Sequence, residues 1–379
     1  MRIGIDVSVL CNQWDGIGTY TIDVLKYIFR TPSTDEYYLY ADRKLETELK
    51  FDKRFHLFVD EGTNHLLWLL TKLPKYAKRD SLDVFWQPNF LLPFRIKGMC
   101  NVVNVHDMSA YAYSKFASTK TNITHKLFLR PTCEKADTIL AISNNGAKEI
   151  VKYFPKVKEK VQTIYIGKKM FENGLDANEG VCSEYLEELG LAAKDYLLFV
   201  GTLSPRKNAN VIIDSYFEYR KKGGKKKLVL AGNIATKCIN IKKVIEQNRY
   251  GKDVVIAGYI TDQQKRILYY HAAMLLFPSR LEGFGFPILE GMQAKIPVIT
   301  SNCSCMPEIA GDAAVYLNDI DSAEELALHI LEVEQMSPEE QSQMIARGLE
   351  RVAYFDGLHY PQLVLEAIHN AKDKQGKEL

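Results

Sequence analysis

Two glutamates, Glu282 and Glu290, stand eight positions apart in the segment EGFGFPILE. The segment follows the apolar run MLLFPS, which is typical of a buried strand, and leads into PILEGMQA, which is typical of a helix with Pro287 in its first turn. A glycine-rich loop that opens a helix presents free N–H groups and the positive end of the helix dipole, which together suit a phosphate. Acids on both sides of such a loop could bind the ribose and sugar hydroxyls that flank a diphosphate. The spacing alone is weak evidence, so the prediction rests on the surrounding strand and loop.

Two adjacent cations, Arg206 and Lys207, follow the apolar run YLLFVG in the turn SPRKN. Cations at a strand end can neutralise the charge that develops on a departing diphosphate. The alternative is a solvated turn. With these cations no metal is required, and the triplet from Asp319 to Asp321 is interpreted as a loop and helix cap rather than as a metal site.

The first half of the chain holds weaker signals. Gly16 and Gly18 stand between a predicted strand and a predicted helix, and a lone G-x-G is poor evidence for phosphate binding. His106 and Asp107 end the run NVVNVHD, where a histidine is more often structural than functional. Ser143 is predicted to cap the helix that follows it, and Asp107 to stabilise its own loop.

The elements that must position these residues are short apolar strands that alternate with helices. This alternation predicts an α/β fold of βαβ units, and strands that are apolar on both faces predict parallel sheets covered on each side. The strands are expected at 3–9, 56–59, 84–86, 101–106 and 138–143, and again at 196–201, 227–232, 254–258, 274–279 and 297–301.

A polar stretch without a strand, residues 166–194, separates the two groups of strands and is interpreted as a linker that enters a short helix. The sequence therefore predicts two doubly wound domains, 1–170 and 171–357, facing each other across a cleft. A last helix is expected within about 358–379. Ligands in such sheets bind beyond the carboxyl ends of the strands, which is where the segments above would lie.

The segment EGFGFPILE, in the context PS-x-x-EGFGFPILE, resembles the E-x7-E element of glycosyltransferase family 4, whose members are retaining enzymes of the GT-B fold. The resemblance covers most of the chain and is strongest over about 196–316, where SPRKN and the run MPEIAGDAA also match. The chain departs from the family at GMQAKIP, where altered helix packing is expected. The resemblance implies that Glu290 binds the donor ribose and that Glu282 lies beside the transferred sugar. It implies a donor-binding loop formed by Gly283, Phe284, Gly285 and Phe286, in which Gly285 and Phe286 offer backbone amides to the sugar and diphosphate.

The same resemblance implies roles elsewhere. Arg206 and Lys207 would bind the diphosphate, Gly258 and Tyr259 would lie by the nucleotide base, and His106 would meet the sugar hydroxyls. Gly16 and Gly18 would approach the donor phosphate, although Asp15 replaces a glycine that the family often has. The turn at Ser143 would lie near the acceptor, and the last helix would return to the first domain.

Composition fits a globular chain of two domains: 379 residues, 46% apolar and 25% charged. Residues 1–170 hold 26 Lys+Arg against 18 Asp+Glu, and the remainder 23 against 29. The basic first half indicates an anionic partner, either a phosphate-bearing acceptor or a membrane surface, or simply solvated lysines. The seven cysteines show no pairing pattern and are predicted to be reduced thiols.

Neither a signal peptide nor a transmembrane run is found, so a cytoplasmic protein is expected, with peripheral contact at the inner membrane face as an alternative. HLLWLLTKLP, residues 65–74, is predicted to be a half-buried helix. The second interpretation is an apolar membrane-facing surface beside Lys72, Lys75, Lys78 and Arg79. The lysine-rich stretch 221–227 is interpreted as an exposed turn, without nucleic-acid binding.

These observations predict a metal-independent, cofactor-free glycosyltransferase, and the family resemblance implies that it is a retaining enzyme. It would move a hexosyl group, which analogy with the family suggests is mannosyl, from a nucleotide diphosphate sugar to a glycan or lipid-linked acceptor in polysaccharide assembly. Catalysis is assigned to Glu282, His106, Arg206 and Lys207, with Glu282 as a covalent nucleophile the less favoured mechanism. A nucleotide-sugar epimerase of the same fold and a non-catalytic sugar-nucleotide-binding subunit remain as alternatives.

Overall fold

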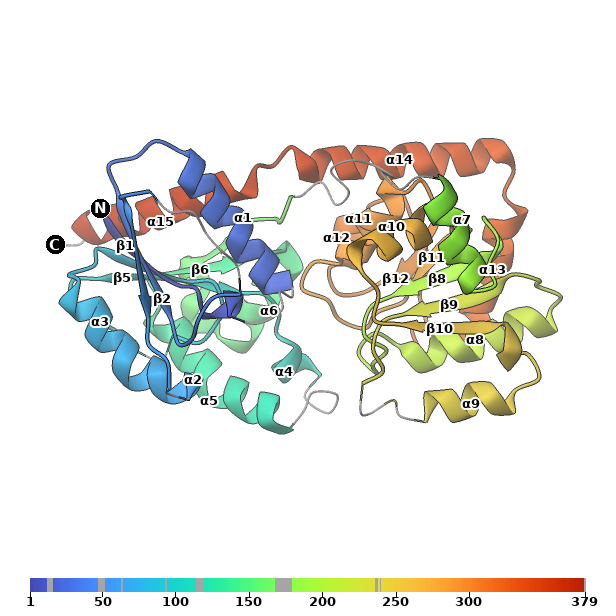
Figure 1. The fold of residues 1–379 in the computed structure, drawn as a ribbon, viewed down its shortest axis with the longest axis horizontal. Helices are drawn as coiled ribbons and strands as arrows, with labels where there is room; N and C mark the ends of the chain where they lie inside the picture. The colour runs from blue at the N-terminus through green and yellow to red at the C-terminus, as the bar shows by residue number, and fades with distance from the viewer. Residues whose placement is uncertain are drawn as a thin grey trace. The chain divides into compact units, whose positions relative to one another are not determined.

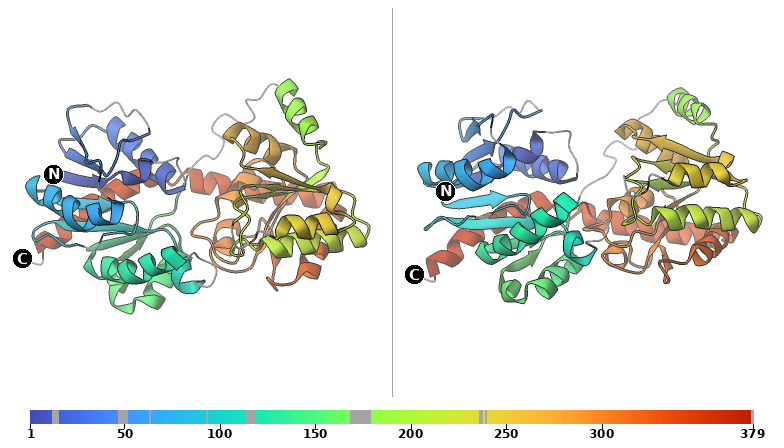
Figure 2. Two further views of the ribbon diagram at one scale, coloured as in Figure 1. Left: turned by 60° about the horizontal axis from the view of Figure 1, so that its bottom comes forward. Right: turned by 90° about the horizontal axis from the view of Figure 1, so that it is seen from below.

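A computed structural model describes residues 1–11, 16–46, 52–62, 64–92, 94–113, 119–167, 179–235, 238 and 240–377. The chain divides into two compact units (Figure 1). Unit 1 comprises Met1–Gly167 and Leu358–Leu379, and unit 2 comprises Lys168–Gly357. In both units helices cover the two faces of a twisted sheet (Figure 2).

The described part of unit 1 contains a seven-stranded sheet in the order β3-β2-β1-β4-β5-β6-β7, with every pair parallel. The central strands are buried on both faces, as parallel strands between helices must be. Their bounds are β1 Arg2–Asp6, β2 Glu36–Ala41, β3 Phe55–Val59, β4 Val84–Gln87, β5 Cys100–Val105, β6 Thr138–Ala141 and β7 Val161–Thr163.

Two groups of helices enclose this sheet. α1 (Gly16–Arg30) contacts α15 (Tyr360–Lys377), and α15 also contacts β4 and β5. Apolar residues from the other helices form one core cluster with the opposite face of the sheet. These helices are the π-helical turn Trp68–Lys72, α3 (Leu73–Arg79), α5 (Thr119–Lys135) and α6 (Asn144–Tyr153). The short α2 (His65–Leu67) precedes the π-helical turn, and the short α4 (Ser109–Ala112) lies beside α5.

Unit 2 contains, within its described residues, a six-stranded parallel sheet in the order β10-β9-β8-β11-β12-β13. The strands are β8 Tyr196–Val200, β9 Lys227–Ala231, β10 Val254–Gly258, β11 Met274–Phe277, β12 Val298–Ser301 and β13 Val315–Leu317. One core cluster joins the sheet to α8 (Ala209–Lys221), α9 (Ile241–Gln247) and α13 (Ala323–Gln335). The remaining helices are α7 (Glu179–Glu188), α10 (Asp262–His271), α11 (Phe286–Gln293), α12 (Met306–Ala310) and α14 (Pro338–Asp356).

The structure confirms the predicted α/β class and all ten predicted strands, although several end earlier than expected. Three further strands were missed: β2, β7 and β13. The prediction that 65–74 is a half-buried helix is also confirmed, because Trp68, Leu69 and Leu73 are fully buried while Leu67 and Leu70 are 54% and 44% exposed.

In each sheet the strand order reverses at one point, where successive strands begin to be added on the other side of the first strand. In unit 2 this point lies between β8 and β11, and in unit 1 it lies between β1 and β4. The loops that leave two such strands diverge to opposite sides of the sheet, and the crevice between them is where open α/β sheets bind ligands.

Candidate active site

The two cation- and acid-bearing segments of unit 2 leave the strands on either side of this reversal. The turn with Arg206 and Lys207 follows β8, and the loop with Glu282 follows β11. The backbone joins them as well, since Arg280 N donates to Arg206 O over 2.9 Å. The two segments are therefore in direct contact at one edge of a single sheet.

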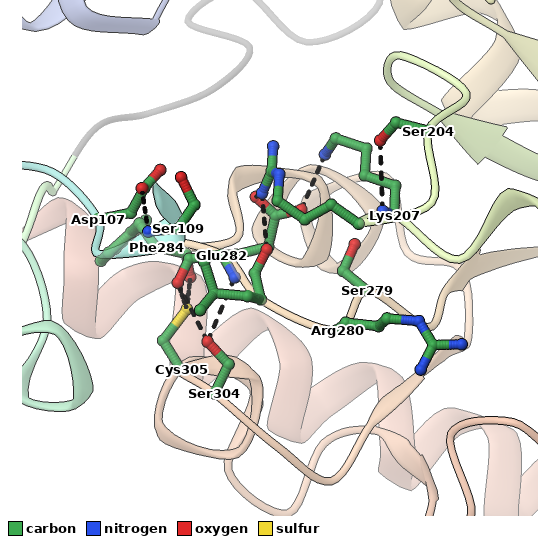
Figure 3. Close-up of polar contacts among 12 residues, drawn as sticks. Asp107, Ser109, Ser204, Lys207, Ser279, Arg280, Glu282, Phe284, Ser304 and Cys305 are labelled. Carbon is green, nitrogen blue, oxygen red and sulfur yellow. Dashed lines mark hydrogen bonds and ion pairs between the residues drawn. The ribbon is translucent and has the colours of Figure 1, made fainter. Parts of the chain in front are cut away.

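Their side chains form one ionic cluster (Figure 3). Arg206 Nη1 lies 2.9 Å from Glu282 Oε2, and Lys207 Nζ lies 2.9 Å from Glu282 Oε1. Arg206 also donates to Leu281 O over 2.6 Å. The Glu282 side chain is only 11% exposed. Burial alone would raise the pKa of Glu282, but the charges of Lys207 and Arg206 outweigh it and hold that pKa below its usual range. The cluster therefore carries one net positive charge.

A glycine makes room for the lysine of this cluster. Gly201, directly after β8, has φ +135°, and a Cβ built there would lie 3.1 Å from Lys207 Cδ and Cε. The lysine stem therefore crosses the backbone at a position that favours glycine, and its ammonium lies over the Phe277 ring, 4.7 Å from the centroid. Packing of this kind fixes the position of the charge.

The loop that begins at Glu282 is held by hydrogen bonds from the turn between β12 and α12. Ser304 Oγ accepts from Glu282 N and donates to Glu282 O, over 3.2 and 3.1 Å. The Cys305 thiol donates to the carbonyls of Glu282 and Phe284, over 3.2 and 3.1 Å (Figure 3). These two roles could not be predicted from the sequence, because nothing in a short polar turn indicates which backbone it will contact.

The same loop opens helix α11 as predicted. Gly285 is its N-cap residue with φ +98°, a left-handed conformation that favours glycine, and Phe286 and Pro287 begin the helix. Phe284 is buried, and its ring packs against Phe286 and Phe355, with centroids 5.1 and 5.3 Å away. Gly283 lies in the loop between Glu282 and Phe284. The aromatic rings thus anchor a loop whose glycines leave the helix N-terminus uncovered by side chains of their own.

Glu290 lies inside α11, and its side chain is 5% exposed. Lys265, from α10, places Nζ 2.8 Å from Glu290 Oε1. Tyr269 lies fully buried one turn further along α10, and burial together with the Glu290 carboxylate raises the pKa of its hydroxyl. Lys265 and Tyr269 were not predicted to belong to the site, although their spacing of four places them on one helix face.

Gly258 ends β10 with φ +67°, and Tyr259 follows it with its side chain 65% exposed. Gly258 O accepts from Gly232 N over 2.7 Å, and Gly201 N donates to Ala231 O over 2.8 Å. The carboxyl ends of β8, β9 and β10 are therefore tied together through glycines. The structure places both predicted base-binding residues at the same edge of the sheet as the ionic cluster.

The predicted residues of unit 1 lie at the carboxyl edge of its own sheet. His106 follows β5, its Nε2 lies 2.7 Å from Pro88 O, and its ring packs edge-on against Tyr20. Gly16 begins α1, whereas Gly18 lies buried within its first turn rather than in a loop. Asp15 lies outside the described residues.

Two capping predictions in unit 1 are confirmed. Asp107 Oδ1 accepts from Ser109 N over 2.8 Å, which stabilises the loop before α4. Ser143 Oγ accepts from Gly146 N over 3.0 Å as the N-cap of α6.

The triplet from Asp319 to Asp321 lies in the turn before α13, where Ser322 is the N-cap and Asp321 is paired with Arg280. Within the described ranges no group of three or more His, Cys, Asp or Glu is arranged to hold a metal ion. All seven cysteines are free thiols. No helix of the described chain is long and apolar enough to span a bilayer.

Two Rossmann-like units, each with a parallel sheet and a strand-order reversal, define the GT-B fold of glycosyltransferases. Residues 184–351 match the family model "Glycosyl transferases group 1" and form a domain of that family. The chain is 26% identical over 345 residues to O-antigen chain mannosyltransferase B of Escherichia coli, covering 84% of this chain and 86% of the relative.

Solved structures agree on the fold. The Alr3699/HepE protein of Anabaena, crystallised with UDP-glucose, superposes with a TM-score of 0.73 at 16% identity, over 98% of this chain and 100% of that one. WaaG, a glycosyltransferase involved in lipopolysaccharide biosynthesis, gives 0.73 at 15% identity, over 97% and 99%. The predicted GT-B fold is thus confirmed, and residues 184–351 match the group 1 glycosyltransferase model.

Proposed function

We propose that this protein transfers a hexosyl group, with retention of configuration, from a nucleotide diphosphate sugar to a glycan or lipid-linked acceptor. The observation that carries the proposal is the Arg206–Glu282–Lys207 cluster at the strand-order reversal of unit 2, beside the N-terminus of α11. Two cations and a helix N-terminus at one point suit a diphosphate, and the adjacent carboxylate suits sugar hydroxyls.

In the proposed reaction the bond between the anomeric carbon and the diphosphate oxygen breaks through an oxocarbenium-like state, and its electron pair remains on the diphosphate. Arg206 and Lys207 would stabilise that charge. The acceptor hydroxyl would attack from the face that the diphosphate leaves, which gives retention, and a donor phosphate oxygen would take its proton. Glu282 would then orient the sugar rather than form a covalent intermediate, consistent with its engagement by two cations.

The remaining assignments follow the positions of the residues. We propose that Glu290 binds the ribose, that Gly258 and Tyr259 flank the base, and that amides at 283–286 contact sugar and diphosphate. Unit 1 would bind the acceptor. Gly16 and Gly18 would approach the phosphates, and His106 would contact the transferred sugar.

We propose mannose as the sugar, because the relative aligned over 84% of this chain is named as an O-antigen mannosyltransferase. The test is release of nucleoside diphosphate and formation of product from GDP-mannose, UDP-glucose and UDP-galactose, each with and without a mannose-terminated glycan. Sugar epimerised from donor alone would favour the epimerase, and binding without turnover would favour the non-catalytic subunit.

The proposed role of the cations is tested by Lys207→Ala, with Lys225→Ala as the control, because Lys225 lies in the exposed turn before β9. Loss of turnover in the first variant alone supports the diphosphate assignment, and unchanged turnover contradicts it. Metal independence, which we propose because two cations can neutralise the leaving group, predicts full activity in excess EDTA. Recovery of a lost activity by Mg²⁺ or Mn²⁺ would refute that part.

We further propose that unit 1 contacts the inner face of the membrane that carries a lipid-linked acceptor. Leu67 and Leu70 are exposed on a helical segment that continues into α3, which carries the exposed Lys75 and Lys78. Apolar side chains beside lysines suit an anionic lipid surface. Sedimentation with phosphatidylglycerol vesicles tests this contact, with phosphatidylcholine vesicles as the comparison. The Leu67→Ser/Leu70→Ser variant is expected to sediment less than wild type with phosphatidylglycerol vesicles and no differently with phosphatidylcholine vesicles.

A further inference from the structure

The carboxylate assigned to the ribose is already held by a cation from a neighbouring helix. Lys265 and Glu290 come from α10 and α11, two helices in contact, and their charged atoms are 2.8 Å apart. The Glu290 side chain is 5% exposed and the Lys265 side chain 27%. A carboxylate this buried needs a partner, because an isolated buried charge is costly.

Lys265 remains charged in this environment. Burial would lower the pKa of its ammonium, but the charge and hydrogen bond of Glu290 outweigh burial, and the pKa of Lys265 is raised. The other charged groups that act on it are Asp262 and Arg266, on its own helix. The site is therefore a charged pair, with Tyr269 buried against the same carboxylate.

Helix packing does not by itself call for this pair. α10 buries Ile267 and Leu268, and α11 buries Ile288 and Leu289. A buried ion pair adds little to stability compared with apolar side chains of similar size. What the pair does fix is orientation, because Lys265 Nζ is bonded to one named oxygen, Oε1, and so sets how the carboxylate is turned.

We propose that Lys265 is a positioning residue that holds Glu290 as an oriented acceptor for the ribose hydroxyls, and that this pair makes the site select ribonucleoside over deoxyribonucleoside diphosphates. The inference rests on the proposed function, which places a ribose at Glu290. A carboxylate discriminates in this way because each ribose hydroxyl donates to it, and a deoxyribose leaves a buried acceptor without its donor.

The experiment measures binding to the full chain by calorimetry, with GDP and UDP and with the 2′-deoxy and 3′-deoxy form of each. Lys265→Met keeps the length of the side chain and removes its charge. Arg266→Met is the matched control, since it removes a cation from the next position of the same helix. Thermal unfolding of each variant shows whether it is folded, and Lys265→Gln is a second variant that retains a hydrogen-bond donor.

Wild-type protein is expected to bind its preferred ribonucleotide on the order of tenfold more tightly than at least one deoxy form. In Lys265→Met the affinity for the ribonucleotide is expected to fall while the affinity for the deoxynucleotide changes little, so the ratio of the two affinities falls toward one. Arg266→Met is expected to retain the wild-type ratio. Glu290→Gln loses it as well, and adding Lys265→Met to Glu290→Gln changes the ratio no further.

Two outcomes overturn the inference and differ in what else they affect. The wild-type protein could bind ribonucleotides more tightly than deoxynucleotides while Lys265→Met weakens the binding of both equally or of neither. In that case the lysine does not act through the ribose site, and the proposed function stands. If the wild-type protein binds no nucleoside diphosphate, both the inference and the proposed donor site are wrong.

Discussion

One carboxylate shared by two cations is the central feature of unit 2 at the scale of single residues. In the structure Glu282 occupies the positions on Arg206 and Lys207 that a diphosphate would need. It keeps two like charges close together and oriented, and it also competes with an incoming anion. The glutamate would thus prepare the site and oppose ligand binding at once.

This competition predicts that Glu282→Gln binds nucleoside diphosphate more tightly than wild type, on the order of tenfold, although transfer falls steeply. The neutral amide no longer offsets the two cations, and under the proposed role of Glu282 it would also no longer orient the sugar. Calorimetry with the nucleotide and a turnover assay measure the two effects. Asp253→Asn, which breaks the Arg220–Asp253 pair elsewhere in the unit, serves as the control. Weaker nucleotide binding in Glu282→Gln would contradict the competition.

The same cluster predicts a pH dependence of stability. In the folded state the pKa of Glu282 is lowered from the reference value of 4.5. The ionised Glu282 therefore stabilises the folded state in full above about pH 4.5, and this contribution is lost as the pH falls through the lowered pKa. The difference in free energy of unfolding between wild type and Glu282→Gln should be constant from pH 7 to about 5 and narrow below 4.5. Urea unfolding of both proteins measures it. A difference in free energy of unfolding that widens as the pH falls would contradict the prediction.

At the scale of elements, the glycines that end the strands hold the site edge together. Gly232 follows β9 with φ +141°, and a Cβ added there would lie 2.2 Å from Gly201 O. Gly232→Ala is therefore expected to cost both a strained φ and a backbone clash, about 3 kcal/mol in free energy of unfolding.

Gly223 separates these two effects. It has φ +98°, but no atom lies within 4 Å of an added Cβ, so Gly223→Ala should cost only about 1 kcal/mol of backbone strain. Chemical denaturation of both variants gives the comparison. Equal losses would show that the close approach of the strand ends relaxes without cost.

The strands that could be predicted from the sequence are those with continuous apolar runs, because a strand buried on both faces needs them. β2, with the sequence EYYLYA, was not predicted, although tyrosine is common in strands and Tyr37 and Tyr40 are fully buried. Tyr40 is accommodated through a hydrogen bond of 2.8 Å to Asp80, forty positions away. β7 and β13 have three residues each, too few to show a period.

The candidate site shows the same limit. Arg206, Lys207 and Glu282 could be found because each stands beside a glycine- or proline-marked strand end in a recognisable segment. Lys265 and the turn of Ser304 and Cys305 could not, because a helix face and a short turn reach the site only through tertiary packing. Sequence identifies the groups that would meet a ligand, and the fold identifies the groups that hold them.

At the scale of the whole molecule, two consecutive C-terminal helices serve different units. α14 belongs to unit 2, where Phe355 is buried against the ring of Phe284. α15 belongs to unit 1, where Tyr360 is buried, stacks on Tyr20 with centroids 5.4 Å apart, and donates to Asp23 over 2.9 Å. Five positions of sequence thus separate an aromatic anchor of one core from an aromatic anchor of the other.

Tyr360→Ala and Phe355→Ala should each cost about 3 kcal/mol, as truncation of a buried aromatic residue usually does, but in different places. Tyr360→Ala should speed amide hydrogen exchange in β1 and β4 and leave β8 and β11 unchanged. Phe355→Ala should do the reverse, and the Phe284 loop beside Glu282 should exchange faster with it. Each variant is therefore the control for the other, measured by exchange and mass spectrometry below the unfolding transition. If either variant accelerated exchange equally in both sheets, the two units would be one cooperative structure, and Glu282 would depend on α15 as much as on α14.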